Sequence, residues 1–147
     1  MKTPAHGFTI IELMIVVAIV AIIVAVGYPS YREQVMKSRR TEAMGELLEL
    51  ADRLERYYAD QGTYCADSPA CTGATLGPAD TDIYPGSTQK GNYTLNITAQ
   101  DDVSFTLQAT PVAGKSQSKD KCQAFTLTSL GDKGISGGSL SAEDCWK

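Results

Sequence analysis

Glu12 is the residue whose type and position most directly suggest chemistry, because it is the only charge in an apolar run from Phe8 to Tyr28. A carboxylate costs about 2.5 to 3.5 kcal/mol at the centre of a bilayer, so it is retained there mainly where it finds a partner. Glu12 follows Phe8 by about one helical turn. If the chain is cut after Gly7, the new amine of Phe8 on one chain could neutralise Glu12 of a neighbour. Alternatively, Glu12 lies in the headgroup zone at the helix end, where its cost is small, and the residues alone leave both interpretations open.

The cysteines form the second reactive group, and all of them lie outside the apolar run, at positions 65, 71, 122 and 145. An even number of cysteines in a small polar head predicts two disulfides and an oxidising compartment. Three pairings are possible, and we expect the most local one, Cys65–Cys71 and Cys122–Cys145. The chain has no C-x-x-C motif and a single histidine, His6. We therefore expect no zinc site, no thiol redox motif and no cofactor.

A short basic cluster in the stretch GKSQSKDK is formed by Lys115, Lys119 and Lys121, and we expect Lys133 to lie near it. Beyond Tyr58 the chain carries ten acidic residues against six lysines, and no aromatic residues are interleaved among the lysines of this cluster to stack bases. The three lysines are therefore weak candidates for DNA binding.

Catalysis is not expected from these residues. His6 would leave with a leader of residues 1–7, which excludes triads built on histidine. The glycine-rich stretch 131–138 follows a predicted strand but leads into no helix, which favours a turn over a phosphate-binding loop. We expect a protein that is not an enzyme.

The elements that position these residues begin with the apolar run. Residues 8–28 form a helix of about 32 Å at ~1.5 Å per residue, which spans a hydrocarbon core of about 30 Å. The preceding segment, MKTPAHG, ends in a glycine at the border of the run. This arrangement suits a cut before the helix, which removes residues 1–7 and keeps the membrane segment, unlike an ordinary secretory signal.

Beyond the span, Pro29 is expected to kink the helix or to melt it locally, with help from Gly27. The helix then resumes within residues 29–62 as an amphipathic segment that ends near Gly62. Its apolar stripe is expected to face a core and consists of Ala43, Leu47, Leu50, Leu54 and Tyr57, with Leu48, Ala51 and Tyr58 beside them. The basic cluster of residues 37–40 is expected to form a solvated or headgroup-facing surface and not a binding site.

Residues 63–91 are rich in turn formers and read as a connecting loop region. Residues 92–147 then show period-two alternation: Tyr93–Ala99 and Val103–Ala109 form a hairpin around Asp101 and Asp102, residues 125–128 form a third strand, and a short fourth strand lies near Ile135. We expect an α+β fold in which the long N-terminal helix covers a small antiparallel sheet.

The N-terminal stretch GFTIIEL, with the later GYPSY, resembles the signature of type IV prepilins. The resemblance implies cleavage between Gly7 and Phe8 by a prepilin peptidase, methylation of the new Phe8 amine, and a role for Glu12 in subunit assembly through a neighbouring Phe8 amine. The motif is shared with the pseudopilins of type II secretion systems, so it does not choose between the two classes.

The C-terminal stretch, which begins DKCQAF and ends EDCWK, resembles PilE-type minor pilins of the type IVa system. The resemblance implies the type IV pilin fold and a minor pilin of a fimbrium that supports pilus assembly, twitching motility, adhesion and DNA uptake. It also implies that residues 122–145 form a loop closed by a disulfide and exposed to other subunits. The alternatives are a DNA-binding competence minor pilin and a secretion pseudopilin.

Partners and location follow from the same resemblance. The implied partners are other pilin subunits through the N-terminal helix, the prepilin peptidase and methyltransferase, the inner-membrane assembly machinery and the membrane before assembly. The implied location is a single-pass precursor of the bacterial inner membrane with its head in the periplasm, and then the extracellular pilus. The positive-inside rule alone disagrees, because one basic residue, Lys2, precedes the span and four follow it: Arg32, Lys37, Arg39 and Arg40. The cysteines and the resemblance favour the periplasmic head.

Overall fold

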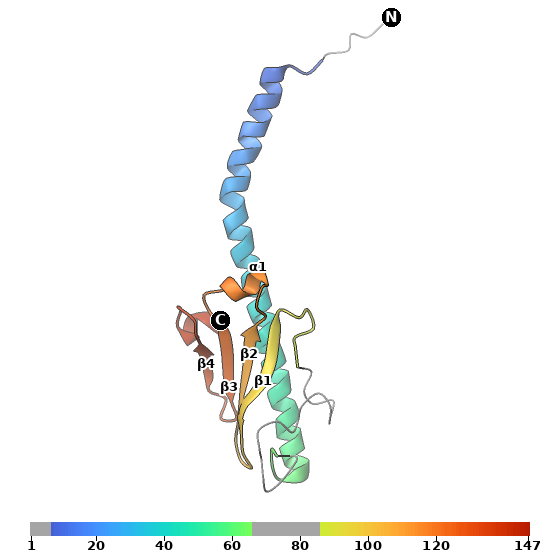
Figure 1. The fold of residues 1–147 in the computed structure, drawn as a ribbon, viewed down its shortest axis with the longest axis vertical. Helices are drawn as coiled ribbons and strands as arrows, with labels where there is room; N and C mark the ends of the chain where they lie inside the picture. The colour runs from blue at the N-terminus through green and yellow to red at the C-terminus, as the bar shows by residue number, and fades with distance from the viewer. Residues whose placement is uncertain (1–6, 66–85) are drawn as a thin grey trace, which may run out of the picture. The chain divides into compact units, whose positions relative to one another are not determined.

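A computed structural model describes residues 7–65 and 86–147 (Figure 1). The chain divides into two compact units, Met1–Val35 and Met36–Lys147. Helix α1, Ile10–Gln61, contributes its first part to the first unit and its remainder to the second. The second unit, which we call the head, also contains the strands.

Helix α1 continues through Pro29 without interruption, so of the two expected effects of this proline, a kink or local melting, the melting is wrong. Proline removes one backbone donor, so one hydrogen bond is lost, while the neighbouring turns keep theirs. The helix ends as predicted: Gln61 is its last residue, and Gly62 follows with φ of +73°. The Gly62 N–H donates to the carbonyl of Tyr58 at 2.7 Å, which closes the last turn.

The head contains an antiparallel sheet of four strands in the order β1-β2-β3-β4. The strands are β1 (Tyr93–Gln100), β2 (Phe105–Pro111), β3 (Ala124–Thr128) and β4 (Lys133–Ser136). A short 3₁₀ helix, η1 (Ser116–Lys119), lies between β2 and β3, and α2 (Ala142–Cys145) follows β4. The expected strands are thus confirmed, with one difference. Val103 lies in the β1–β2 turn and is 70% exposed, because Asp101 accepts bonds from the backbone of the turn and β2 begins only at Phe105.

The core lies between α1 and one face of the sheet, as the stripe predicted (Figure 1). The helix contributes Ala43, Met44, Leu47, Leu50 and Leu54, and the sheet contributes Tyr93, Leu95, Phe105, Leu107, Ala109, Phe125 and Leu127. Leu48, which was expected beside this stripe, is 49% exposed and does not belong to the core.

The two ends of the sheet carry different structures. The β1–β2 and β3–β4 turns are neighbours at one end, where Ser129 N–H donates to the Phe105 carbonyl at 3.0 Å. At the opposite end, Tyr93 pairs with Pro111 and Ala124 pairs with Ser136, so the loop with η1 and the segment that leads to α2 both leave the sheet there. We call these the hairpin end and the loop end.

Candidate functional site

The segment around the expected cleavage bond precedes α1. Residues 7–9 have no regular structure, and Phe8 is 77% exposed. From Ile10 to Val26 the large apolar side chains are also exposed. Within the described residues, α1 is the one helix long and apolar enough to cross a membrane. The first unit therefore presents an apolar helix with an accessible peptide bond in front of it.

Thr9 caps the start of α1 through its bonds with Glu12. The Thr9 hydroxyl accepts from the Glu12 N–H at 3.3 Å and donates to the Glu12 carboxylate at 3.4 Å. Such a cap satisfies a backbone N–H that has no partner within the helix. Sequence reasoning missed Thr9, although the T-x-x-E spacing before an apolar run is the known signal for this cap. Glu12 therefore has a local structural role beside the assembly role that the resemblance implies.

The lysines of the GKSQSKDK stretch lie at the loop end of the head, around η1, and all three are exposed: Lys115, Lys119 and Lys121. The Lys115 ammonium donates to the carbonyl of Gly91, just before β1. The structure brings a further cation to this group, since Arg39 on α1 donates to Ser116 Oγ at 2.5 Å. We call the cationic residues of the loop end the basic end: Lys37, Arg39, Arg40, Lys115, Lys119, Lys121 and Lys147.

Lys133 does not join this group. It pairs with Leu127 near the end of β3, whereas Lys121 precedes the start of β3, so the two lysines lie at opposite ends of that strand. The Lys133 ammonium lies 5.4 Å from the centre of the Trp146 ring, a cation–π distance. The expected proximity is therefore wrong, because the β3–β4 hairpin carries Lys133 away from η1.

Arg40 is buried, which corrects the expectation that residues 37–40 form a solvated surface. Its side chain is 9% exposed and forms a two-point ion pair with Asp120, whose side chain is fully buried. The Arg40 Nε donates to Asp120 Oδ2 at 2.8 Å, and Nη2 donates to Oδ1. A paired guanidinium and carboxylate satisfy each other where either alone would be costly to bury. The pair fixes η1 to α1.

Gln117 and Tyr93 extend this buried network. The Gln117 Nε2 lies 2.8 Å from both Asp120 Oδ2 and the Tyr93 hydroxyl oxygen, and it also faces the Met36 carbonyl at 3.5 Å. Burial, with a smaller contribution from the Asp120 charge, raises the pKa of Tyr93 well above its ordinary value. The residues of the network are nearly inaccessible to solvent, so the network offers no open catalytic group.

Tyr64 plays a comparable part at the hairpin end. Its ring stacks on Tyr58 and meets Phe105 edge to face, and its hydroxyl donates to Glu55 at 2.8 Å. Burial and the bond to Glu55 raise the pKa of Tyr64 to about 12. The residue thus closes the core where α1 ends.

A disulfide joins Cys122 to Cys145, with Cα atoms 5.8 Å apart. It links the residue that follows Lys121 to the last residue of α2. Trp146 follows directly, meets Phe125 edge to face and donates its indole N–H to the Gly134 carbonyl at 2.8 Å. The other expected disulfide, Cys65–Cys71, includes Cys71, which lies outside the described residues, as do residues 66–85 of the expected connecting region.

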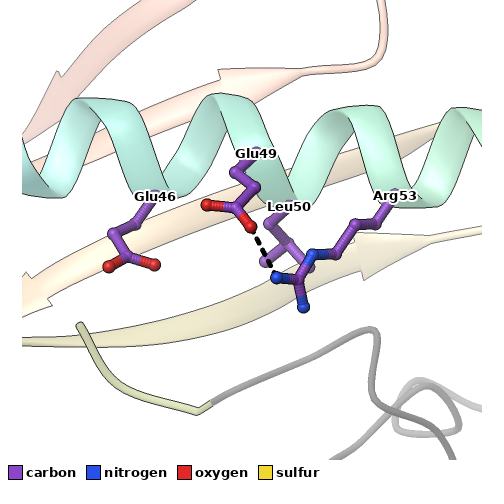
Figure 2. Close-up of a pocket in the computed structure, with 4 residues that line it drawn as sticks. All are labelled: Glu46, Glu49, Leu50 and Arg53. Atoms are coloured by element: carbon purple, nitrogen blue, oxygen red, sulfur yellow. Dashed lines mark hydrogen bonds and ion pairs between the residues drawn. The ribbon is translucent and has the colours of Figure 1, made fainter. Parts of the chain in front are cut away.

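A recess beside α1 is lined by Glu46, Glu49, Leu50 and Arg53 (Figure 2). Glu49 and Arg53 pair at 2.5 Å across it, and it has no room for a water molecule. Within residues 7–65 and 86–147, no three His, Cys, Asp or Glu side chains gather where they could hold a metal ion. The candidate sites in the described chain are therefore the α1 N-terminus and the basic end.

Two family descriptions match the sequence. Residues 2–28 match the prokaryotic N-terminal methylation motif, and residues 29–126 match the family described as type IV minor pilin ComP, DNA uptake sequence receptor.

Curated relatives include the type IV major fimbrial protein FimA of Dichelobacter nodosus, which is 36% identical over 97% of this chain and 77% of its own length. The type IV major pilin protein PilE1 of Neisseria gonorrhoeae is 32% identical over 70% of this chain and 44% of its own length. Among solved structures, the minor pilin PilV of Neisseria meningitidis is similar with a TM-score of 0.51 and 23% identity, over 74% of this chain and 94% of PilV.

Proposed function

The chain belongs to the type IV pilin family, and on that premise we propose that it is a minor subunit whose basic end contacts DNA. As a family member it is a structural subunit of a type IV pilus. It is made as a single-pass precursor in the inner membrane and then passes into the extracellular filament. Other pilin subunits and the processing machinery are its partners. What we propose beyond family membership is that the subunit is a minor one, that individual residues have the roles given below, and that the basic end contacts DNA.

The match of residues 29–126 to a minor pilin family supports the minor status. Quantitative mass spectrometry of sheared filaments tests it. We expect a trace of a peptide that begins at a methylated Phe8, relative to the dominant pilin. Stoichiometric amounts would make this chain the major subunit. Absence from filaments, with the processed form confined to the inner membrane, would overturn the filament role in favour of a pseudopilin.

For the N-terminus, we propose that the peptidase cuts between Gly7 and Phe8, that the new Phe8 amine is methylated, and that Glu12 pairs with the Phe8 amine of a neighbouring subunit. The exposed segment before α1 and the apolar helix behind it support this arrangement. The pair would remove the cost of a carboxylate among apolar helices, since each charge neutralises the other.

Glu12→Gln separates this role from the Thr9 cap, because glutamine keeps the capped backbone N–H and a side-chain acceptor for the Thr9 hydroxyl but carries no charge. We expect the variant to be cleaved normally and to be lost from filaments. Thr9→Val removes the cap and leaves the carboxylate, so it is the matched control and is expected to enter filaments. If Glu12→Gln is incorporated as well as the wild type, the Glu12 charge is not needed for assembly and the proposed pair is wrong.

The DNA contact is a second candidate function, supported by one observation: the matched family is described as a DNA uptake sequence receptor. The basic end adds a physical reason, because exposed Lys115, Lys119 and Lys121 are joined there by Lys37 and Arg39 from α1. Cations gathered on one end attract phosphates even when the whole chain carries a net charge of −4. Salt-dependent binding of a DNA duplex, weakened when Lys119 and Lys121 become alanine, is the expected result.

A further inference from the structure

The hairpin end of the head exposes two large apolar side chains on neighbouring turns. Val103 in the β1–β2 turn is 70% exposed, and Leu130 in the β3–β4 turn is 87% exposed. Thr106 pairs with Thr128 where β2 meets β3. Two further steps of this register place Leu130 opposite Ser104, the residue that follows Val103. The two side chains therefore form one apolar patch rather than two scattered exposures.

Hydrogen bonds hold both turns in shape. The Asp101 carboxylate accepts from the N–H groups of Val103 and Ser104 at 2.9 and 2.7 Å. In the other turn, the Thr128 hydroxyl accepts from the Asp132 N–H at 3.1 Å. A side chain carried by such a turn loses little backbone freedom when a partner covers it, so less of the binding energy is spent on ordering the surface. The patch is therefore preorganised for a contact.

The charges around the patch are acidic. The exposed charged residues of the two turns are Asp101, Asp102 and Asp132. Lys133 follows directly, but its ammonium lies over the Trp146 ring. We call the two apolar residues and the three acids the hairpin tip: Asp101, Asp102, Val103, Leu130 and Asp132. A matching partner offers positive charge around an apolar surface.

The connection between β2 and β3 offers such a surface at the opposite end of the head (Figure 1). We call residues 112–121 the η1 loop. Its exposed charged residues are all basic, namely Lys115, Lys119 and Lys121. Its one acid, Asp120, is buried against Arg40, and its first two residues are apolar and accessible to solvent. The adjoining α2 segment and Lys147 carry charges of both signs, so the uniformly basic surface ends at this loop.

We propose that the hairpin tip of one copy docks on the η1 loop of a second copy of this chain. Opposite charges fix the orientation, since tip against tip or loop against loop would bring like charges together. Val103 and Leu130 then lie against the apolar start of the loop and the aliphatic stems of its lysines. Because the contact uses two different surfaces, each copy keeps one of them for the next, as extension of a filament requires.

The contact goes beyond the proposed DNA contact and rests only on membership of the filament. A head-to-tail run always leaves the η1 loop of its last copy uncovered. That copy keeps its lysines for DNA, so the two contacts use the same loop without excluding each other. A run of two copies is enough, which agrees with a subunit present in trace amounts.

The test is zero-length cross-linking in filaments sheared from cells that produce the chain. A water-soluble carbodiimide joins a carboxylate and an amine in direct contact through an amide bond, and peptide mass spectrometry identifies the joined residues. We expect links from Asp102 and Asp132 to lysines of the η1 loop. Strand β1, with 8 residues at ~3.3 Å each, separates the two ends of one head by about 26 Å. Such a link therefore joins two copies and never one copy to itself.

Leu130→Ser tests the apolar patch without removing a carboxylate or an amine. We expect the yield of these links, per copy of the chain in the filament, to fall at least about fivefold. Leu48→Ser is the matched control, because it removes a leucine that is 49% exposed on α1 and belongs to neither surface. Its yield is expected to equal that of the wild type. Equal yields for the two variants would overturn the docking role of the patch.

Three other outcomes also overturn the proposal. Links from the hairpin tip to the dominant pilin alone would assign this surface to a different partner. Filaments that contain the chain but yield no link between the hairpin tip and the η1 loop would exclude the contact, while the filament role and the DNA contact stand. Absence of the chain from filaments would refute the filament role together with the contact.

Discussion

Removal of the Asp120 carboxylate should destabilise the head far more than the loss of any exposed ion pair. In Asp120→Ala, the buried Arg40 guanidinium loses both of its hydrogen bonds to the carboxylate. Gln117 Nε2 and the Cys122 N–H lose an acceptor at 2.8 and 3.4 Å. Breaking a buried pair by deleting one partner costs about 3 to 5 kcal/mol, because an uncompensated charge remains.

The assay is thermal unfolding of the full chain in detergent, followed by near-UV circular dichroism of the core aromatic residues. For a head of about 110 residues, 1 kcal/mol corresponds to about 4 °C in Tm, so we expect a decrease of about 12 to 20 °C. Asp52→Ala is the control, since it breaks the exposed pair with Arg56 and should cost less than about 1 kcal/mol.

A double replacement tests the physical reason. Arg40→Met combined with Asp120→Leu removes both charges, so it should recover most of the lost stability, because apolar residues often replace a buried ion pair without net cost. If Asp120→Ala lowers Tm no more than Asp52→Ala, the pair is not compensating a buried charge and the reasoning is refuted.

Three further predictions concern the head. Replacing Cys122 and Cys145 together by serine should lower the free energy of unfolding by about 3 kcal/mol in the chain-entropy account, measured by urea unfolding, and an unchanged midpoint would contradict it. Because the folded pKa of Tyr64, about 12, lies above its unfolded value of about 10, its contribution to stability is complete below pH 10 and is lost as the pH rises towards 12. Tyr64→Phe should therefore show a smaller decrease of Tm between pH 10 and 12 than the wild type. If Tm falls equally steeply in both proteins, ionisation of Tyr64 does not cause the decrease. An added Cβ at Gly138 would lie 2.7 Å from the Cys122 carbonyl oxygen, so Gly138→Ala should lower the free energy of unfolding by about 1 to 3 kcal/mol. Gly45→Ala, on the open surface of the helix, is the control and should raise the free energy of unfolding by up to about 1 kcal/mol. Comparable Tm values for the two variants would show that the backbone relaxes around the clash.

The main elements of the head could be predicted from residue periodicity. The stripe through Ala43, Leu47, Leu50 and Leu54 identified the buried face of α1, because a helix brings such positions to one side. Alternation likewise predicted the strands. It failed at Val103, because Asp101 binds the backbone of the turn and keeps that residue outside β2.

The buried pair could not be predicted in the same way. Arg40 stands in a run of basic residues, and its partner Asp120 lies 80 positions away in a loop. Only the folded chain brings them together, so a residue that resembles solvated surface is buried. Thr9 is the opposite case, since its spacing from Glu12 was visible in the sequence and its role as a cap was overlooked.

The margins of the sheet have a consequence for a protein that is displayed among many related heads. An open strand edge is a template for β-strand addition and uncontrolled aggregation. Here β4, at one margin, is only four residues long, and Trp146 engages the Gly134 carbonyl, while Ser87 forms a bridge to Thr94 on β1 at the other margin. Both margins are thus partly occupied by the chain's own residues. Partly covered edges disfavour pairing between the sheets of neighbouring heads. Contacts between subunits are then made by helices and side chains.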